Sequence, residues 1–279
     1  MNRYSSYNET QLEELFSNYL IDSWSYSKVT SFARNEKEFE KREIYRERSR
    51  RSASSVAGNA YHAALQLFFE SLSNGIQAPI SELEQIAFLY IDEVHANDWK
   101  LQKTIPTVEE CKIKATKSAS VFLRNFYNEL SIYTSVLKTI LGVELRCDEW
   151  LTINGVDIPL PCHGIIDLVI ETKDGKTIII DHKSKTKFTD EDEIAFTAGK
   201  QAITYVKSYE SKTGKKVDEV WFIENKESQN KDGSPQLKRH RIIINEDTEK
   251  LYEALLYEPL KRMIEAVSDP DYEIGRAHV

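Results

Sequence analysis

The sequence predicts an α+β fold, in which a helical N-terminal half packs on a mixed central sheet that is flanked by further helices. Two observations carry this prediction. From about residue 9 to 141, apolar residues recur every three to four positions, which is the period of amphipathic helices. From Gly142 onwards the period shifts towards two, which is typical of strands.

The same periods place the individual elements. Helices are predicted at 10–20, 29–47, 55–72, 80–99 and 108–130, and later at about 193–210 and 247–267. Strands are predicted at 142–153, 162–172, 176–184, 216–225 and 236–245. We expect residues 1–23 to form an N-terminal helical extension. Residues 24–267 are expected to form one domain, with a helical part at 24–141 and the sheet with its helices at 142–267.

Composition indicates an ordinary globular protein, with 41% hydrophobic and 29% charged residues. We find no apolar run near 18 residues and no basic-then-apolar start, so we expect no membrane span, no secretory leader and a cytoplasmic location. The three cysteines, Cys111, Cys147 and Cys162, are scattered without a Cys-x-x-Cys motif. They predict buried free thiols and no iron–sulfur cluster.

The charge is unevenly distributed. The net charge of -8 argues weakly against a nucleic-acid partner. However, residues 28–51 hold nine Lys or Arg against five Glu, a local net charge of +4. A DNA-binding segment and an ordinary solvated surface both fit this pattern.

Two apolar segments carry three charged residues at their centre. Asp167 lies in "HGIIDLVIET", and Asp181 and Lys183 lie two residues apart in "TIIIDHKS". Burying a charge is costly unless the charge is paired or binds a metal. Because side chains two apart on a strand share a face, Asp181 and Lys183 point the same way.

The turn between these strands decides whether Asp167 joins them. A two-residue turn at the Asp-Gly pair would send Asp167 to the other face. A three-residue loop with Gly175 in the left-handed conformation pairs Thr172 with Lys176 and places Asp167 opposite Asp181. The sequence "KDGK" suits this second turn, closed by a glycine bulge, and we predict that register.

Two neighbouring carboxylates do not both ionise without a cation between them. Oxygen ligands suit a hard ion, Mg²⁺ or Mn²⁺, and a lysine beside it can neutralise charge that develops on a phosphoryl group. A buried Asp–Lys ion pair without a metal is the alternative.

Glu144 is a further candidate ligand. If Asn154-Gly155 forms a two-residue turn, Ile153 pairs with Val156 and Gly142 pairs with Asp167. Glu144 then shares the face of Asp167. Prolines at 159 and 161 can disturb this register, so the assignment stays open.

These residues resemble the core of the PD-(D/E)XK phosphodiesterase superfamily, in which an Asp is followed by Asp/Glu-x-Lys. Three further segments resemble its RecB-like nuclease branch: "SYSKVTSF" (Ser25–Phe32), "GNAYH" (Gly58–His62) and "QAITY" (Gln201–Tyr205). The match covers about residues 24 to 265. It implies a restriction-endonuclease-like α/β core, a divalent metal and hydrolysis of DNA phosphodiesters.

The resemblance also implies roles for single residues. Asp167 and Asp181 would be metal ligands and Lys183 the catalytic lysine. His62 would be a further ligand, although a lone His on an apolar stripe is more often a core residue. His182 faces away from the metal by strand parity, so only its backbone carbonyl could ligate. Gln201 and Tyr205 share one helix face, which in the family lines the DNA path.

The function expected from this resemblance is that of a Mg²⁺- or Mn²⁺-dependent deoxyribonuclease. Exonuclease activity in recombination, repair or phage DNA metabolism, inside a bacterial or phage-infected cell, is favoured over restriction. A basic helix would hold the DNA backbone without reading its sequence, through Arg42, Arg46, Arg48, Arg50 and Arg51. A recombinase or helicase partner is left unassigned. A catalytically inactive DNA-binding or scaffold protein of the same fold is the alternative.

The last six residues, Ile274–Val279, are treated separately. The sequence "IGRAHV" matches the in-frame translation of a common sequencing adapter, which indicates a non-native tail. We therefore exclude it from the fold prediction.

Overall fold

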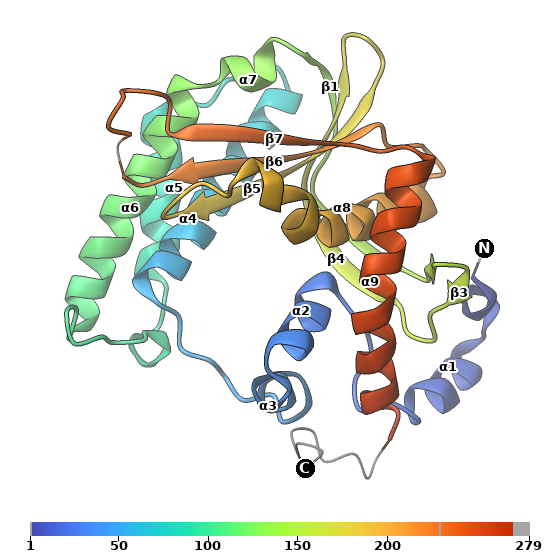
Figure 1. The fold of residues 1–279 in the computed structure, drawn as a ribbon. Helices are drawn as coiled ribbons and strands as arrows, with labels where there is room; N and C mark the ends of the chain where they lie inside the picture. The colour runs from blue at the N-terminus through green and yellow to red at the C-terminus, as the bar shows by residue number, and fades with distance from the viewer. Residues whose placement is uncertain (1, 229, 270–279) are drawn as a thin grey trace.

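A five-stranded sheet lies at the centre of the computed structural model, which describes residues 2–228 and 230–269 (Figure 1). The strand order is β1-β4-β5-β6-β7, and only β5 and β6 run parallel, so the sheet is mixed as predicted. The strands are β1 (Leu137–Glu149), β4 (Cys162–Thr172), β5 (Thr177–Lys185), β6 (Glu219–Lys226) and β7 (Leu237–Ile243). A separate small hairpin pairs β2 (Thr152–Ile153) with β3 (Val156–Asp157).

Helices cover both faces of the sheet. The longer ones are α1 (Glu9–Phe16), α2 (Tyr26–Arg34), α4 (Ala53–Ser73), α5 (Ile80–Asp92), α6 (Val108–Asn128), α8 (Glu191–Thr213) and α9 (Glu246–Val267). The short ones are α3 (Glu36–Phe39) and α7 (Ser131–Thr134), with 3-10 turns η1 (Arg3–Ser6) and η3 (Ala96–Asp98) and a π-helical turn η2 (Glu40–Ile44).

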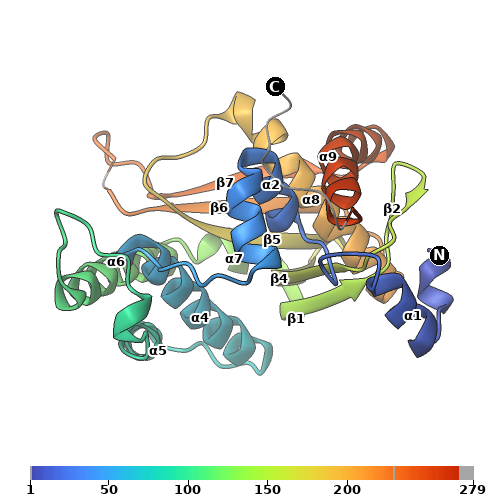
Figure 2. The ribbon, with the colours of Figure 1, turned by 90° about the horizontal axis from the view of Figure 1, so that it is seen from below.

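Two hydrophobic cores share the sheet. The first, on what we call the α8 face, packs α2, α3, α8 and α9 against residues such as Val169 and Ile179. The second, on the α4 face, packs α4, α5, α6 and α7 against residues such as Leu168 and Ile180. Alternate strand residues thus feed opposite cores, which explains why β4 and β5 are apolar almost throughout. Figures 1 and 2 both show α4, α5 and α6 gathered apart from α2 and α9.

The prediction of one continuous helix at 29–47 is wrong. Asn35 has φ -160°, ends α2 and begins α3, because its side chain accepts a hydrogen bond from the backbone N of Glu38. The predicted basic helix around Arg42–Arg51 is also wrong. Residues 46–50 form no helix and Arg46 has φ +53°, so most of the basic segment is an irregular connector between η2 and α4.

The predicted switch from helix to strand at Gly142 comes slightly late. Strand β1 already begins at Leu137, directly after α7. No helix among residues 2–228 and 230–269 is long and apolar enough to cross a membrane. The proposed tail at 274–279 lies outside the described residues.

Candidate metal and catalytic centre

The predicted turn between β4 and β5 is confirmed. Gly175 has φ +85°, and the backbone N of Thr172 donates to the O of Lys176 at 2.9 Å. The ladder pairs Leu168 with Ile180 and ends one step before Asp167 and Asp181, so the turn brings both acidic residues to the same end of the ladder. The predicted placement of the two side chains on one face is not borne out, because Asp181 contacts Lys183 and Gln201 whereas Asp167 contacts His62 and the ring of His182 on the α4 side.

Asp181 is buried, with 2% of its surface exposed, and several donors hold it. Its Oδ1 accepts hydrogen bonds from Lys183 Nζ at 3.0 Å, Tyr205 Oη at 2.9 Å and Gln201 Nε2 at 3.2 Å. Gln201 Nε2 also lies 2.8 Å from Tyr205 Oη, which ties the two α8 residues together. The predicted face of α8 thus orients the first carboxylate of the site.

Lys183 neutralises this carboxylate. Its Nζ lies 2.9 Å from Asp181 Oδ2. Burial lowers the pKa of Lys183, but the charge and hydrogen bond of Asp181 together with the charge of Asp167 outweigh burial, and the net pKa is raised, so the amine stays cationic. Burial raises the pKa of Asp181; Lys183 opposes this shift and the charge of Asp167 adds to it.

Asp167 collects donors from another direction. Its Oδ2 accepts a hydrogen bond from the backbone N of His182 at 2.7 Å and lies 3.4 Å from His62 Nδ1. Burial raises the pKa of Asp167, but the contacts with His182 and the charge of His62 outweigh it and the net pKa is lowered. His62 lies on α4, so the two halves of the chain meet at this carboxylate.

Glu144 completes this group, although its predicted register is wrong. The hairpin pair Ile153–Val156 forms as expected, but Gly142 pairs with Val169 rather than with Asp167. The break in the ladder between the hairpin and the Glu149–Cys162 pair accounts for the two-residue difference, because the register is constant from that pair to Gly142. An error of two residues keeps the side-chain parity, so Glu144 still faces Asp167.

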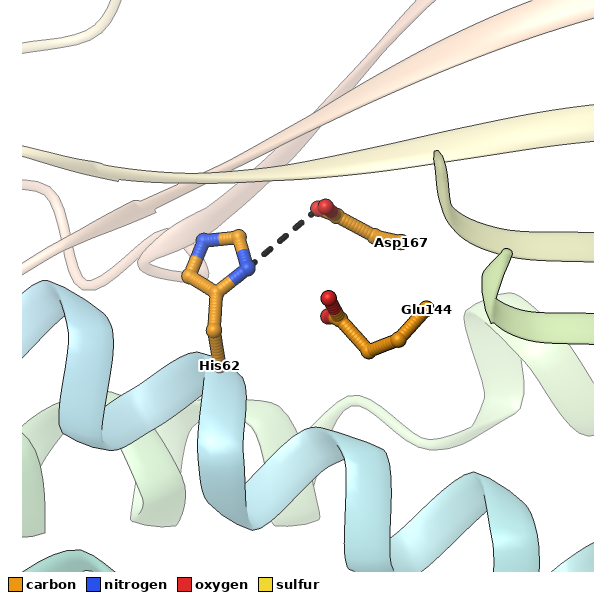
Figure 3. A group of neighbouring side chains, drawn as sticks. All are labelled: His62, Glu144 and Asp167. Carbon is orange, nitrogen blue, oxygen red and sulfur yellow. Dashed lines mark ion pairs between the residues drawn. The ribbon is translucent and has the colours of Figure 1, made fainter. Parts of the chain in front are cut away.

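Figure 3 shows His62, Glu144 and Asp167 pointing toward one another from α4, β1 and β4. One ligand atom of each lies within 4.8 Å of those of the other two. Burial raises the pKa of Glu144 to about 7, and the charge of Asp167 contributes in the same direction. Two carboxylates held this close favour a bound cation.

The strands deform where this group forms. Val143 packs in the core of the α4 face, whereas Leu145, two residues later, packs in that of the α8 face. On β4, Leu168 and Ile166 show the same change. Residues two apart on a regular strand share a face, so the alternation slips at Glu144 and Asp167 together. Glu144 has φ +45°, a costly backbone conformation that is frequent at functional sites.

A glycine lets helix α4 approach strand β5. A Cβ at Gly58 would lie 2.6 Å from Ser184 Oγ on β5. Gly58 precedes His62 by one helical turn, so the same close approach brings His62 towards Asp167. This gives the Gly-x-x-x-His spacing a physical reason.

The imidazole of His182 faces the α4 side, away from Lys183, as strand parity predicts. It is 1% exposed, stacks on Phe69 and lies 3.0 Å from Tyr133 Oη through Nε2. Its Nδ1 also lies 3.6 Å from Asp167 Oδ2, a contact that the sequence did not indicate. The role of its backbone carbonyl as a ligand stays a prediction.

The residues present fit a divalent metal. Oδ2 of Asp181 is buried and is paired with the charge of Lys183 Nζ at 2.9 Å without the geometry of a hydrogen bond, so a lone pair of this oxygen is left for a metal ion. His62, Glu144 and Asp167 supply one nitrogen and two carboxylate groups beside it. This oxygen-rich donor set suits a hard divalent cation.

The predicted DNA-binding arginines divide into three groups. Arg42 lines a groove with Lys183 and Gln201. Arg46, Arg48 and Arg50 are exposed on the connector. Arg51 is partly structural, because its backbone pairs with that of Trp99 and its guanidinium lies 3.8 Å from Asp98.

Two residues near the site were missed in the sequence. Glu70 lies two turns beyond His62 on α4, and its charge helps to raise the pKa of Glu144. The eight-residue spacing from His62 could have indicated it. Arg34 lines the same groove as Arg42. The sequence pattern that could have indicated Arg34 is the stripe of polar residues, at helical spacing, that starts at Ser27.

The comparisons with known proteins concern the family and the fold. No curated protein matches the sequence. The crystal structure of a candidate exonuclease from Eubacterium rectale aligns with a TM-score of 0.54 at 12% identity, covering 94% of this chain and 86% of that chain. That of LHK-Exo in complex with dAMP aligns with a TM-score of 0.27 at 16% identity, covering 76% and 92%. The family described as the PD-(D/E)XK nuclease superfamily matches residues 23–277, and the chain belongs to it.

Proposed function

We propose that this protein is a Mg²⁺- or Mn²⁺-dependent DNA nuclease whose catalytic domain spans residues 24–267. The observation that carries the proposal is the buried carboxylate of Asp181, paired with Lys183 beside the group of His62, Glu144 and Asp167. Charged groups this deeply buried are costly to maintain for stability alone. In a nuclease fold, metal binding and catalysis would account for keeping these charged groups buried.

Each residue has a definite part in this proposal. Asp167, Asp181, His62 and Glu144 would hold the metal, together with the backbone carbonyl of His182. When bound, the ion supplies polarisation of the phosphoryl oxygen and a lowered pKa for water. Lys183 would stabilise the charge that develops on the phosphoryl group, and Gln201 and Tyr205 keep Asp181 oriented.

DNA is the proposed substrate and exonucleolytic cleavage the proposed mode. The support is the resemblance of the Gly58–His62 and Gln201–Tyr205 segments to RecB-like nucleases. On the basis of that resemblance we propose a role in recombination, repair or phage DNA metabolism.

The test is a cleavage assay on linear, circular and single-stranded DNA with Mg²⁺, Mn²⁺ or EDTA. Asp167→Asn and Asp181→Asn should abolish cleavage while DNA binding persists, because each removes a ligand and a negative charge near the phosphate. Lys183→Ala should keep the metal and slow single-turnover cleavage by orders of magnitude. The matched control is Asp92→Asn, which removes the charge of an exposed carboxylate on α5 that pairs with Lys112.

Two results would count against the proposal. Wild-type turnover by both aspartate variants would mean that the site is misassigned. DNA binding without hydrolysis in either metal would favour the alternative, a non-catalytic DNA-binding protein of this fold.

A further inference from the structure

Helix α2 presents a polar stripe beside the candidate catalytic lysine. Ser27, Thr30, Ser31 and Arg34 are spaced by three or four residues and line one groove, whereas Val29 and Phe32 pack in the core of the α8 face. The sequence thus aims one side of α2 at the core and the other at the groove. Tyr26, at the start of this helix, donates to the backbone O of Thr197 at 3.0 Å and so anchors α2 to α8.

The groove has a volume of about 320 Å³ and reaches the catalytic strand. Lys183 and Gln201 line one part of it, and Arg34 and Arg42 line another. Arg42 comes from the π-helical turn η2, which follows the break at Asn35. The same break that ends the predicted helix therefore brings two arginines to one groove.

The charge of this groove is positive and unneutralised. Within the described residues, neither Arg34 nor Arg42 has an ion-pair or hydrogen-bond partner on its side chain. The groove's one carboxylate, Glu43, lies 3.8 Å from Lys28 and is offset by it. Two free guanidinium groups near hydroxyl side chains form a typical receptor for a phosphate group.

We propose that this groove binds a second phosphate of the substrate strand, the neighbour of the phosphate that is cleaved. The inference rests on the proposed nuclease function and deepens it. Lys183 would meet the scissile phosphate at one end of the groove, while Arg34 and Arg42 hold the adjacent phosphate in a bidentate manner. The substrate class is then a nucleic-acid strand with consecutive phosphates rather than a lone phosphodiester.

The experiment compares two substrates. One is a short single-stranded oligonucleotide, and the other is the p-nitrophenyl ester of thymidine 5′-phosphate, which has one phosphodiester and no neighbour. For Arg34→Ala and Arg42→Ala, the loss of kcat/KM should be at least about tenfold greater on the oligonucleotide than on the ester. Arg34→Lys should restore part of this difference, because it keeps the charge without the fork. Arg124→Ala, on the remote helix α6, is the control.

A second readout does not depend on catalysis. Binding of the oligonucleotide to the Asp181→Asn protein, followed by fluorescence anisotropy across a salt series, should lose about 0.7 from its log–log slope for each arginine removed. Equal losses on both substrates, or an unchanged slope, would overturn the proposal. If the wild type cleaves neither substrate, the nuclease function fails, whereas the anisotropy series still decides whether the groove binds a phosphate strand.

Discussion

Among single residues, Glu144 is a carboxylate of the site with a raised pKa. Burial and the negative charge of Asp167 raise it to about 7. A bound cation reverses both effects, because it compensates the lost hydration and screens Asp167. We predict that Glu144→Gln lowers the affinity for Mn²⁺ by at least about 10-fold, because loss of even an outer partner of a metal site commonly costs that much and Glu144 is proposed as a ligand. Isothermal titration calorimetry measures it, and an unchanged affinity would exclude Glu144 from the metal site.

Glu219 shows the opposite displacement, away from the site. It is buried in β6, where Arg241, Trp221 and Lys176 donate to it and lower its pKa from 4.5 to about 2, although burial raises it. A lowered folded-state pKa gives stability that is present above pH 4.5 and is lost as the pH falls towards 2. The shift from 4.5 to about 2 is equivalent to at most about 3.4 kcal/mol.

We therefore predict that Glu219→Gln lowers the free energy of unfolding at pH 7 by about 2 to 3 kcal/mol. The difference from the wild type should shrink as the pH drops from 5 to 3. Urea unfolding at several pH values measures it. A difference that stays constant across this range would assign the loss to packing rather than to the ionised carboxylate.

At the scale of elements, the contact of α4 with β5 sets the geometry of His62. Gly58→Ala should raise helix propensity by about 1 kcal/mol, yet its methyl group would meet Ser184 Oγ. We predict an undiminished melting temperature together with weaker Mn²⁺ binding, because α4 must move away from β5. Gly58→Val should weaken binding further.

The matched rescue is the double variant Gly58→Ala with Ser184→Ala. Removing the hydroxyl leaves Ser184 Cβ at 3.7 Å from the new methyl group, an ordinary contact. Mn²⁺ affinity should then recover. If Gly58→Ala alone binds Mn²⁺ as the wild type does, rotation of the serine absorbs the contact and the glycine is not needed for the site.

How far each element could be predicted follows from how local its signal is. The Asp-Gly turn before Lys176 fixes its own register, so the pairing of β4 with β5 up to Leu168 and Ile180 was predictable, whereas the slip in alternation at Asp167 was not. The register of β1 depends on the unequal connections that join it and β4 to the small β2–β3 hairpin, and the prediction was wrong by two residues. The break at Asn35 was missed, although an Asn followed by Glu three residues later is a recognised helix start.

Across the whole molecule, the site lies where the two cores meet. Asp181, Lys183 and Gln201 belong to the α8 side, whereas His62 and the ring of His182 belong to the α4 side. Sequence periodicity predicts the helices of each side but not their docking across the sheet, because docking depends on contacts such as Gly58 with Ser184. Identifying His62 as part of the site therefore required the family resemblance first and the structure afterwards.

The two sides are joined along the chain by the basic connector from η2 to α4, which is visible in Figure 1. Because Arg46, Arg48 and Arg50 are exposed on a segment without regular structure, they can follow a DNA backbone. We predict that replacing all three by Ala lowers the slope of log K against log salt for duplex DNA by up to about 2.7, at about 0.9 per phosphate contact. Cleavage of saturating DNA should be less affected than affinity. Arg51→Ala should instead lower stability, because Arg51 is tied to Asp98 and Trp99. Binding measured from low to moderate salt decides between the alternatives: an unchanged slope in the triple variant would make the connector an ordinary solvated surface.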